Sequence, residues 1–552
     1  MEANYWARVL HRRQLGRRRF LAGAAAAAGA GLLAACSKSN NNAPGSAGPA
    51  KRGGSLTQAS VGTDAKSFHP YLTTDSPSAA YQGYVYGVGL SQRDPKSLEQ
   101  IPFGATWTVS ADKKTYTFTL KDIKWSDGQP LTTDDFVWTY QQAIKPENKF
   151  PYVDNLDLID SYVAGDPRTL VVTLKDALTV GLEAADQITP LPRHIWEKYP
   201  WGDPSKNPEI NNPSVISGMW KLKEWKQEDH ATFQANDAYF DSRPNIDQMT
   251  VQVFGTPEVA FQALKSGKLD FNPSMQPADY KNAKALKGAT VYEWYPAVGQ
   301  WSYIGINLRR PALQDVNVRH ALAYASDRKG LIEAAAFGLA KPIYAGFVQE
   351  SPVYNGSVEH YDFDPNKARD LLKQAGYALD SNKRLVKDGK QLGLKLLYPT
   401  SSKPREAIAT ILKQQLGDLG INVDIEGQEF QSYVSTIQSP PFDWDLQLGV
   451  WSTSIDPYWA SNLWSEKFVP DLNSGDYINK QVESLFAQGS KEFDEAKRRQ
   501  IYGQIQQILA NESPNVFLYE PLTFVGMSKK VQGIAVSPLG IEYNMNKWFI
   551  SS

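Results

Sequence analysis

The chain is poor in the residues that build disulfides and metal sites. Cys36 is the one cysteine among 552 residues, so no intrachain disulfide can form and a large hydrophobic core must stabilise the fold. None of the six histidines is paired with another at the spacing of metal ligands. They are His11, His69, His194, His230, His320 and His360. We therefore expect neither a bound metal nor a cofactor.

The short motifs of common enzyme classes are missing as well. The sequence contains no Gly-x-Ser-x-Gly nucleophile elbow and no phosphate loop of the Gly-x4-Gly-Lys type. No catalytic residue is therefore assigned, and we expect a protein that is not an enzyme. Carboxylates are abundant, however, and the two that a glycosidase needs must only be close in space. A secreted, lipid-anchored glycoside hydrolase is thus the alternative.

Long apolar runs are absent too. The alanine-rich run from Phe20 to Ala35 is shorter than the roughly 20 residues that a membrane-spanning helix needs. Arginines precede it, and no Asp or Glu occurs between Ala3 and Thr63. A positive segment, a short apolar segment and small residues at its end predict an export signal over residues 1–35.

Two motifs refine this signal. Arg17 and Arg18, followed by Phe20-Leu21, resemble the twin-arginine class of export signal, although the general secretory route stays open. Leu33-Ala34-Ala35-Cys36 resembles a bacterial lipobox, which implies cleavage before Cys36 and acylation of this cysteine. We therefore expect an extracytoplasmic protein that is anchored to the cell membrane by lipid, in the periplasm or on the outer cell surface.

The charge balance excludes a nucleic-acid partner. The chain carries 58 Lys and Arg against 59 Asp and Glu, and removal of the signal takes away six arginines and Glu2, which leaves 52 against 58. The mature chain is therefore mildly acidic, near −6, without a basic stripe. Residues 36–54 contain no aromatic or β-branched residue and predict a flexible tether between the lipid and the folded body.

Strand and helix patterns alternate along the 517 residues that follow the signal, which predicts an α/β protein of more than one domain. Tyr116, Phe118 and Leu120 alternate with polar residues as in a half-buried strand. Thr132 and Asp135 have the spacing of a helix capping box. Helices are also predicted from Thr256-Pro257 to Gly267, from Asp364-Pro365 to Gly376 and over 405–419, and a strand over 421–425.

Several segments, in order, resemble the family 5 solute-binding proteins, the extracytoplasmic receptors of peptide, nickel and oligosaccharide ABC importers. The most recognisable runs from Trp107 through the strand at Tyr116 to Trp125-Ser126-Asp127-Gly128. The others are Lys51–Leu56 with Lys66–Pro70, Ser217–Trp220, Val318–Arg328, Tyr361–Pro365 with Ala375–Tyr377, and Pro514–Tyr519. The resemblance covers essentially the whole chain after the tether.

This resemblance implies a two-lobed periplasmic-binding-protein-like fold of the class II, or cluster C, type. Lobe I is expected to comprise residues 55–84, 205–305 and 518–552, with an extra subdomain inserted at 85–204, and lobe II residues 306–517. The lobes would close over a peptide or oligosaccharide, and the importer's permease would recognise the closed form. We expect a monomer.

The resemblance also suggests where the ligand binds. Relatives that bind peptides usually carry an aspartate three residues after a tryptophan in the second lobe, where it pairs with the peptide's amino group. Here Ser454 stands three residues after Trp451, and Asp456 is either a structural Asp-Pro turn or a shifted amine anchor. We expect ligand contacts from these residues and from neighbouring or hinge aromatics, for each of which core packing is the alternative: Tyr458, Trp459, Trp301 and Tyr303.

Overall fold

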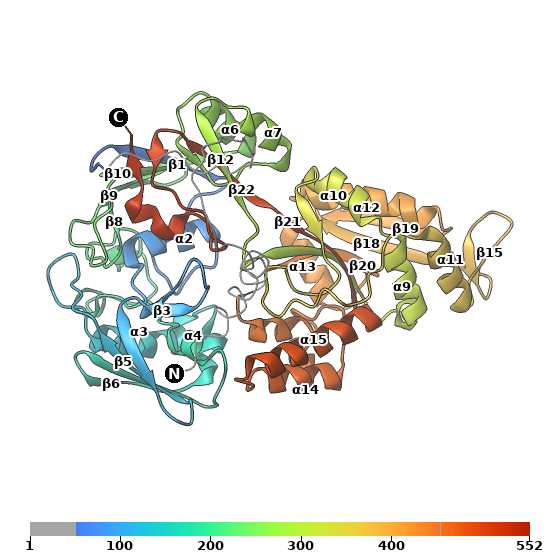
Figure 1. Ribbon diagram of the computed structural model, residues 1–552, viewed down its shortest axis with the longest axis horizontal. Helices are drawn as coiled ribbons and strands as arrows, with labels where there is room; N and C mark the ends of the chain where they lie inside the picture. Colours follow the sequence, from blue (N-terminus) through green and yellow to red (C-terminus); the bar gives the residue numbers. More distant parts are fainter. Residues whose placement is uncertain (1–50, 453, 552) are drawn as a thin grey trace, which may run out of the picture.

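The computed structural model describes residues 51–452 and 454–551. Arg17, Arg18 and Cys36 lie outside the described residues, so the export signal and the lipid site stay predictions. Figure 1 shows two lobes side by side, built around two separate sheets. Within the described part of the chain, each helix is too short or too polar to span a bilayer.

The first lobe is built on a mixed sheet of seven strands. Its order is β12-β22-β11-β1-β10-β9-β8, with β1 parallel to β10 and β11 and the remaining pairs antiparallel. The strands are β1 (Ser55–Val61), β8 (Trp220–Lys226), β9 (His230–Ala235), β10 (Gln248–Phe254), β11 (Phe271–Asn272), β12 (Ala289–Trp294) and β22 (Thr523–Ser528). Its helices are α2 (Ser76–Tyr86), α6 (Pro257–Lys265) and α7 (Tyr280–Lys284).

A smaller unit is inserted into this lobe between α2 and β8. It holds the antiparallel sheet β4-β5-β7-β6, which is visible at the lower left of Figure 1. The elements are β2 (Ser91–Arg93), β3 (Gln100–Pro102), β4 (Ala105–Val109), β5 (Thr115–Leu120), β6 (Ile159–Asp166), β7 (Thr169–Leu174), α3 (Thr133–Ala143), α4 (Gly181–Ala185) and α5 (Arg193–Trp196). Phe118 of the insert and Phe233 of the first lobe belong to one hydrophobic cluster, so the two units share a core.

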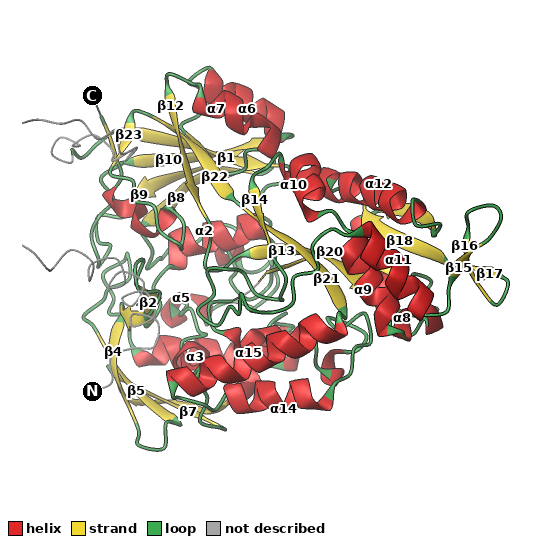
Figure 2. Cartoon of the chain, turned by 45° about the vertical axis from the view of Figure 1, so that its right-hand side comes forward, coloured by secondary structure: helices red, strands yellow, loops and turns green. Residues whose placement is uncertain are grey.

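The second lobe is built on a six-stranded sheet of order β14-β21-β13-β20-β18-β19. Its strands are β13 (Gln300–Ile306), β14 (Ala340–Pro342), β18 (Gly393–Pro399), β19 (Asn422–Gln428), β20 (Leu446–Ser452) and β21 (Asn515–Pro521). Figure 2 shows helices around this sheet. They are α8 (Pro311–Gln314), α9 (Val316–Ala325), α10 (Arg328–Ala336), α11 (Pro365–Gln374), α12 (Lys403–Gly417), α13 (Phe430–Gln438), α14 (Lys480–Gly489) and α15 (Glu495–Glu512).

Two small sheets lie at the periphery. One joins β15 (Ala378–Leu379), β16 (Leu385–Lys387) and β17 (Lys390–Gln391), and the other joins β23 (Val531–Gln532) and β24 (Phe549–Ile550).

The local predictions agree with these elements. Thr132 and Asp135 form the expected capping box at the start of α3, because each side chain satisfies a backbone N–H that the first helical turn leaves unpaired. Proline begins α6 and α11, and Gly267 and Gly376 follow their last turns with positive φ, which glycine adopts without strain. The predicted strand at 421–425 overlaps β19, which begins one residue later at Asn422 and runs to Gln428.

The chain passes between the lobes twice, and we call these connections the crossovers. The first is residues 295–299, between β12 and β13, and the second is Leu522, between β21 and β22. Strand pairing places β13 and all of β21 in the second sheet, whereas the sequence boundaries assigned residues 205–305 and 518–552 to lobe I. Hydrogen bonds between strands far apart in sequence set these limits, which no local pattern reveals.

Candidate ligand-binding site

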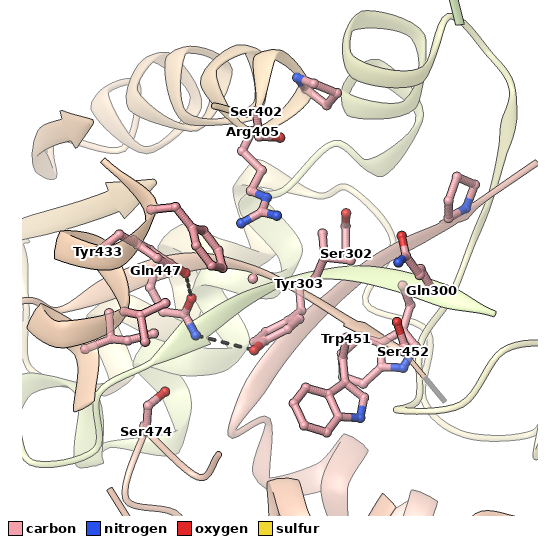
Figure 3. A pocket seen from close by; sticks show the side chains of 18 of the residues that line it. Gln300, Ser302, Tyr303, Ser402, Arg405, Tyr433, Gln447, Trp451, Ser452 and Ser474 are labelled. Carbon is pink, nitrogen blue, oxygen red and sulfur yellow. Dashed lines mark hydrogen bonds between the residues drawn. The ribbon is translucent and has the colours of Figure 1, made fainter. Parts of the chain in front are cut away.

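A cavity of about 620 Å³ opens on the second lobe where β13, β20 and β21 approach α12 and α13. Figure 3 shows side chains from these elements converging on it. Pro277 of the first lobe completes the lining, so the cavity lies between the lobes. Phe430 and Leu472 are more than one-third exposed and line it, which gives it an apolar rim.

The register of β13 against β20 places three predicted residues at this cavity. Trp301 pairs with Trp451, and Tyr303 pairs with Gly449. A Cβ atom at position 449 would lie 2.2 Å from Cζ of Tyr303, so glycine makes room for the tyrosine ring. Trp301 is fully buried and stacks against Trp464, with ring centroids 6.5 Å apart. Trp451 is only half-buried and lines the cavity, whereas Trp301 forms part of the wall from within the core.

The floor of the cavity is polar and neutral. The Tyr433 hydroxyl is hydrogen-bonded to Gln447 Oε1, and Gln447 Nε2 donates to the Tyr303 hydroxyl at 3.5 Å (Figure 3). Burial raises the pKa of both tyrosines above that of a free phenol, so the hydroxyls keep their protons. The floor therefore offers hydrogen bonds without charge.

Arg405 is the cation of this cavity. It lies in the first turn of α12, and Figure 3 shows its guanidinium pointing into the space above the floor. Its Nη1 lies 3.5 Å from the Leu448 carbonyl, and its Nε is buried without a hydrogen-bond partner. Among the described residues no carboxylate lies within ion-pair distance of it, and the other charged lining residue, Asp471, is exposed. A half-buried cation of this kind is suited to an anionic group of a ligand.

The other predicted site residues lie elsewhere. Ser454 lines a second cavity of about 400 Å³, between the insert and the second lobe. Asp456 is buried, pairs with Arg498 at 2.7 Å and accepts a hydrogen bond from the Tyr458 backbone N–H at 2.9 Å. Trp459 donates from Nε1 to Glu183 of the insert at 3.0 Å. The ring centroid of Tyr458 lies 4.9 Å from that of Trp459.

The second cavity contains paired charges. Glu183 forms an ion pair with Arg93 at 2.5 Å, and burial raises its pKa above the ordinary value. Asp186 accepts hydrogen bonds from the backbone N–H groups of Leu90 and Ser91, while burial raises its pKa to about 6. These acids already have partners, so the cavity offers less unpaired charge than the first.

Sequence analysis missed Arg405, Tyr433 and Gln447. Arg405 begins the helix that was predicted over 405–419, but nothing local distinguishes it from a solvent-exposed helical arginine. In the described residues no three His, Cys, Asp or Glu side chains are close enough together to hold a metal ion.

Comparison with known proteins agrees with this architecture. The chain is 28% identical over 531 residues to the oligopeptide-binding protein AppA of Bacillus subtilis (strain 168), covering 93% of this chain and 94% of AppA. The solved structure of AppA from Bacillus subtilis in complex with a nonapeptide matches with a TM-score of 0.76 and 26% identity, over 91% of this chain and all of that one.

The fold also matches NikA from Brucella suis in complex with Fe(III)-EDTA, with a TM-score of 0.78 and 21% identity, over 90% of this chain and all of NikA. The predicted two-lobed fold of the periplasmic-binding-protein type is thus confirmed. None of these matches supports the glycoside hydrolase alternative. The family described as bacterial extracellular solute-binding proteins, family 5 middle, matches residues 104–469. The chain belongs to this family.

Proposed function

We propose that the protein is the substrate-binding receptor of a peptide ABC importer and that Arg405 holds a carboxylate of the ligand. The observation that carries this is the guanidinium in the first cavity, which forms no ion pair with a carboxylate of the described residues. A charge-assisted hydrogen bond to a carboxylate would compensate the partial desolvation of Arg405. The peptide-binding relative supports the class of ligand.

The remaining lining fits a peptide. Trp451 offers an aromatic surface, and Gln447 with Tyr303 offers neutral hydrogen bonds that tolerate different side chains and backbone groups. An oligosaccharide could use the same groups, but a neutral sugar that buried Arg405 would leave its charge uncompensated. We therefore favour a ligand that carries a carboxylate.

In this proposal the protein binds the amino end of its ligand differently from the relatives that carry the aspartate. Ser454 carries no charge, and Asp456 is occupied by Arg498. The ligand is therefore held chiefly through its carboxylate, and blocking its amino group should cost little affinity.

The receptor binds and releases its ligand without chemistry, as a monomer that delivers it to the permease. Ligand contact with both lobes favours the closed form, and only the difference in affinity between the open and closed forms drives closure. In this proposal acylated Cys36 and the tether at 36–54 keep the receptor at the membrane surface beside the permease.

Calorimetry with short peptides tests the proposal. We compare each peptide with its C-terminally amidated and N-acetylated forms, beside a panel of neutral oligosaccharides. Amidation and Arg405→Gln should each weaken binding by about 1.5–3 kcal/mol, the range for a hydrogen bond to a charged group. Arg369→Gln is the matched control, because Arg369 is an exposed arginine on α11. Tight binding of oligosaccharides, or peptide affinity that is unchanged by amidation, would contradict the carboxylate anchor.

A further inference from the structure

Two glutamates meet beside the second crossover. Glu520 lies near the end of β21, two residues before Leu522, and its side chain is only 3% exposed. Its neighbours Tyr519 and Pro521 both line the first cavity. Because side chains alternate along a strand, Glu520 points to the opposite face, toward the segment that contains Glu350.

The two carboxyl groups have too few hydrogen-bond donors. Glu520 Oε2 accepts from the Gln349 backbone N–H at 2.7 Å, and Glu350 Oε1 accepts from Lys341 Nζ at 2.7 Å. Glu520 Oε1 and Glu350 Oε2 are both buried, and neither receives a hydrogen bond from a described residue. Lys341 Nζ is 3.8 Å from Glu520 Oε1, so one ammonium serves two carboxyl groups. A proton shared by the two carboxyl groups would satisfy both remaining oxygens.

Among residues 51–452 and 454–551, Lys341 is the one cation that pairs with Glu350 or Glu520. Lys341 Nζ lies 3.5 Å from the centroid of the Tyr295 ring, and Tyr295 begins the first crossover. The pKa of Tyr295 and that of Tyr354 are raised by burial and by the negative charges of Glu520 and Glu350, so both phenols stay neutral. The other groups that act on Tyr295 are Glu293 and Tyr280. Burial, followed by the charge of Glu350, raises the pKa of Glu520 to about 8.

We propose that Glu350 and Glu520 share one proton and that this proton holds the crossovers between the lobes in one conformation. We call this protonated pair the lock. Loss of the proton leaves two carboxylates in contact with a single ammonium, and their repulsion pushes β21 away from Glu350. The Leu522 N–H donates to the Leu339 carbonyl at 2.9 Å, which ties the second crossover to the strand that carries Lys341. A shift here therefore changes the angle between the lobes. The effect of this shift on ligand binding, through Tyr519 and Pro521, rests on the proposed function. The lock itself does not depend on the proposed function.

The expected pH dependence has a definite sign. The native state keeps a proton on the pair at a pH where the unfolded chain has lost it, so stability falls as pH rises from the ordinary pKa of a glutamate, 4.5, to about 8. Glutamine at position 520 mimics the protonated acid, since its amide oxygen accepts from Gln349 and its NH₂ group donates to Glu350. Glu520→Gln should therefore remove this part of the pH dependence.

Small-angle X-ray scattering and thermal unfolding of the purified full chain, without ligand, test the lock between about pH 6 and about pH 9. We expect the wild type to lose several degrees of Tm and to change its radius of gyration over this range. Glu520→Gln and Glu350→Gln should flatten both profiles. Glu197→Gln is the matched control, because Glu197 pairs with Arg193 on the surface of the insert, and it should follow the wild type.

Profiles of Glu520→Gln that coincide with those of the wild type would overturn the proposal. If this variant does not fold, infrared spectroscopy of the wild type decides. A protonated-carboxyl band should persist at about pH 7 and disappear by about pH 9. Absence of that band at the lower pH would overturn the lock. Because no ligand is present, these outcomes are independent of the test of the proposed function.

Discussion

Asp456 and Arg498 form a buried ion pair, with 2.7 Å between Oδ1 and Nη2 and side-chain exposures of 10% and 5%. The same carboxylate caps the short helix Pro457–Leu463 through the Tyr458 N–H, and Arg498 also donates from Nε to the Gly489 carbonyl at 2.9 Å. The pair thus fastens the segment that follows β20 to α15. Asp456 therefore has a structural role, and its carboxylate is already paired with Arg498.

Replacement of Asp456 by asparagine should destabilise the fold. The substitution removes the charge of one partner of the buried Arg498 guanidinium, and breaking a buried ion pair costs about 3–5 kcal/mol in comparable sites. Urea denaturation measures the loss, with Asp443→Asn as the control, because Asp443 is a largely exposed partner of Lys395. Unchanged stability together with a loss of peptide affinity that matches N-acetylation would mean that Asp456 is the amine anchor after all.

Trp451 should contribute directly to binding. Its half-buried ring lines the first cavity, and removal of an aromatic residue at the centre of an interface costs about 2–4 kcal/mol of binding free energy. Calorimetry of Trp451→Ala with the tightest-binding peptide measures this loss. Trp451→Phe keeps an aromatic surface and should give an intermediate affinity. Equal affinities in all three proteins would show that the ring packs only against the protein.

Trp459 lies outside the first cavity but should stabilise the closed arrangement of the two lobes. Its hydrogen bond to Glu183 joins the second lobe to the insert, and the Thr179 N–H donates to the Ser490 carbonyl at 2.8 Å across the same interface. Loss of a hydrogen bond to a charged group costs about 1.5–3 kcal/mol. Trp459→Phe should therefore weaken ligand binding without removing any contact in the first cavity. Trp107→Phe, on β4 of the insert, is the control, and affinity equal to the wild type in Trp459→Phe would rule out this role.

Cys36 should determine membrane attachment. Cys36→Ala removes the acylation site, so the protein should leave the membrane fraction while the melting temperature of the folded body stays the same. Fractionation of cells that express each form, followed by immunoblotting, measures the distribution. Retention of the variant in the membrane fraction would contradict the lipoprotein prediction.

Short-range sequence patterns were sufficient to predict several of the helices and strands. The capping box of α3, the proline that begins α11 and the alternation in β5 are short-range patterns, because each satisfies backbone groups or buries a face within a few residues. The order of longer motifs was sufficient to indicate the family, and with it two lobes and an insert.

Only the tertiary structure decided which residues meet. Pairing of β13 with β20 brings Trp301 opposite Trp451 although 150 positions separate them, and neither sequence segment contains a signal for this register. Ser454, Asp456 and Trp459 follow closely after Trp451 but leave its cavity, since the chain turns toward the insert and α15. Arg405 lines the same cavity from α12, because the tertiary fold brings the start of this helix close to β20. The sequence by itself determined the elements and the family, whereas long-range strand pairing and burial determined which side chains line the first cavity.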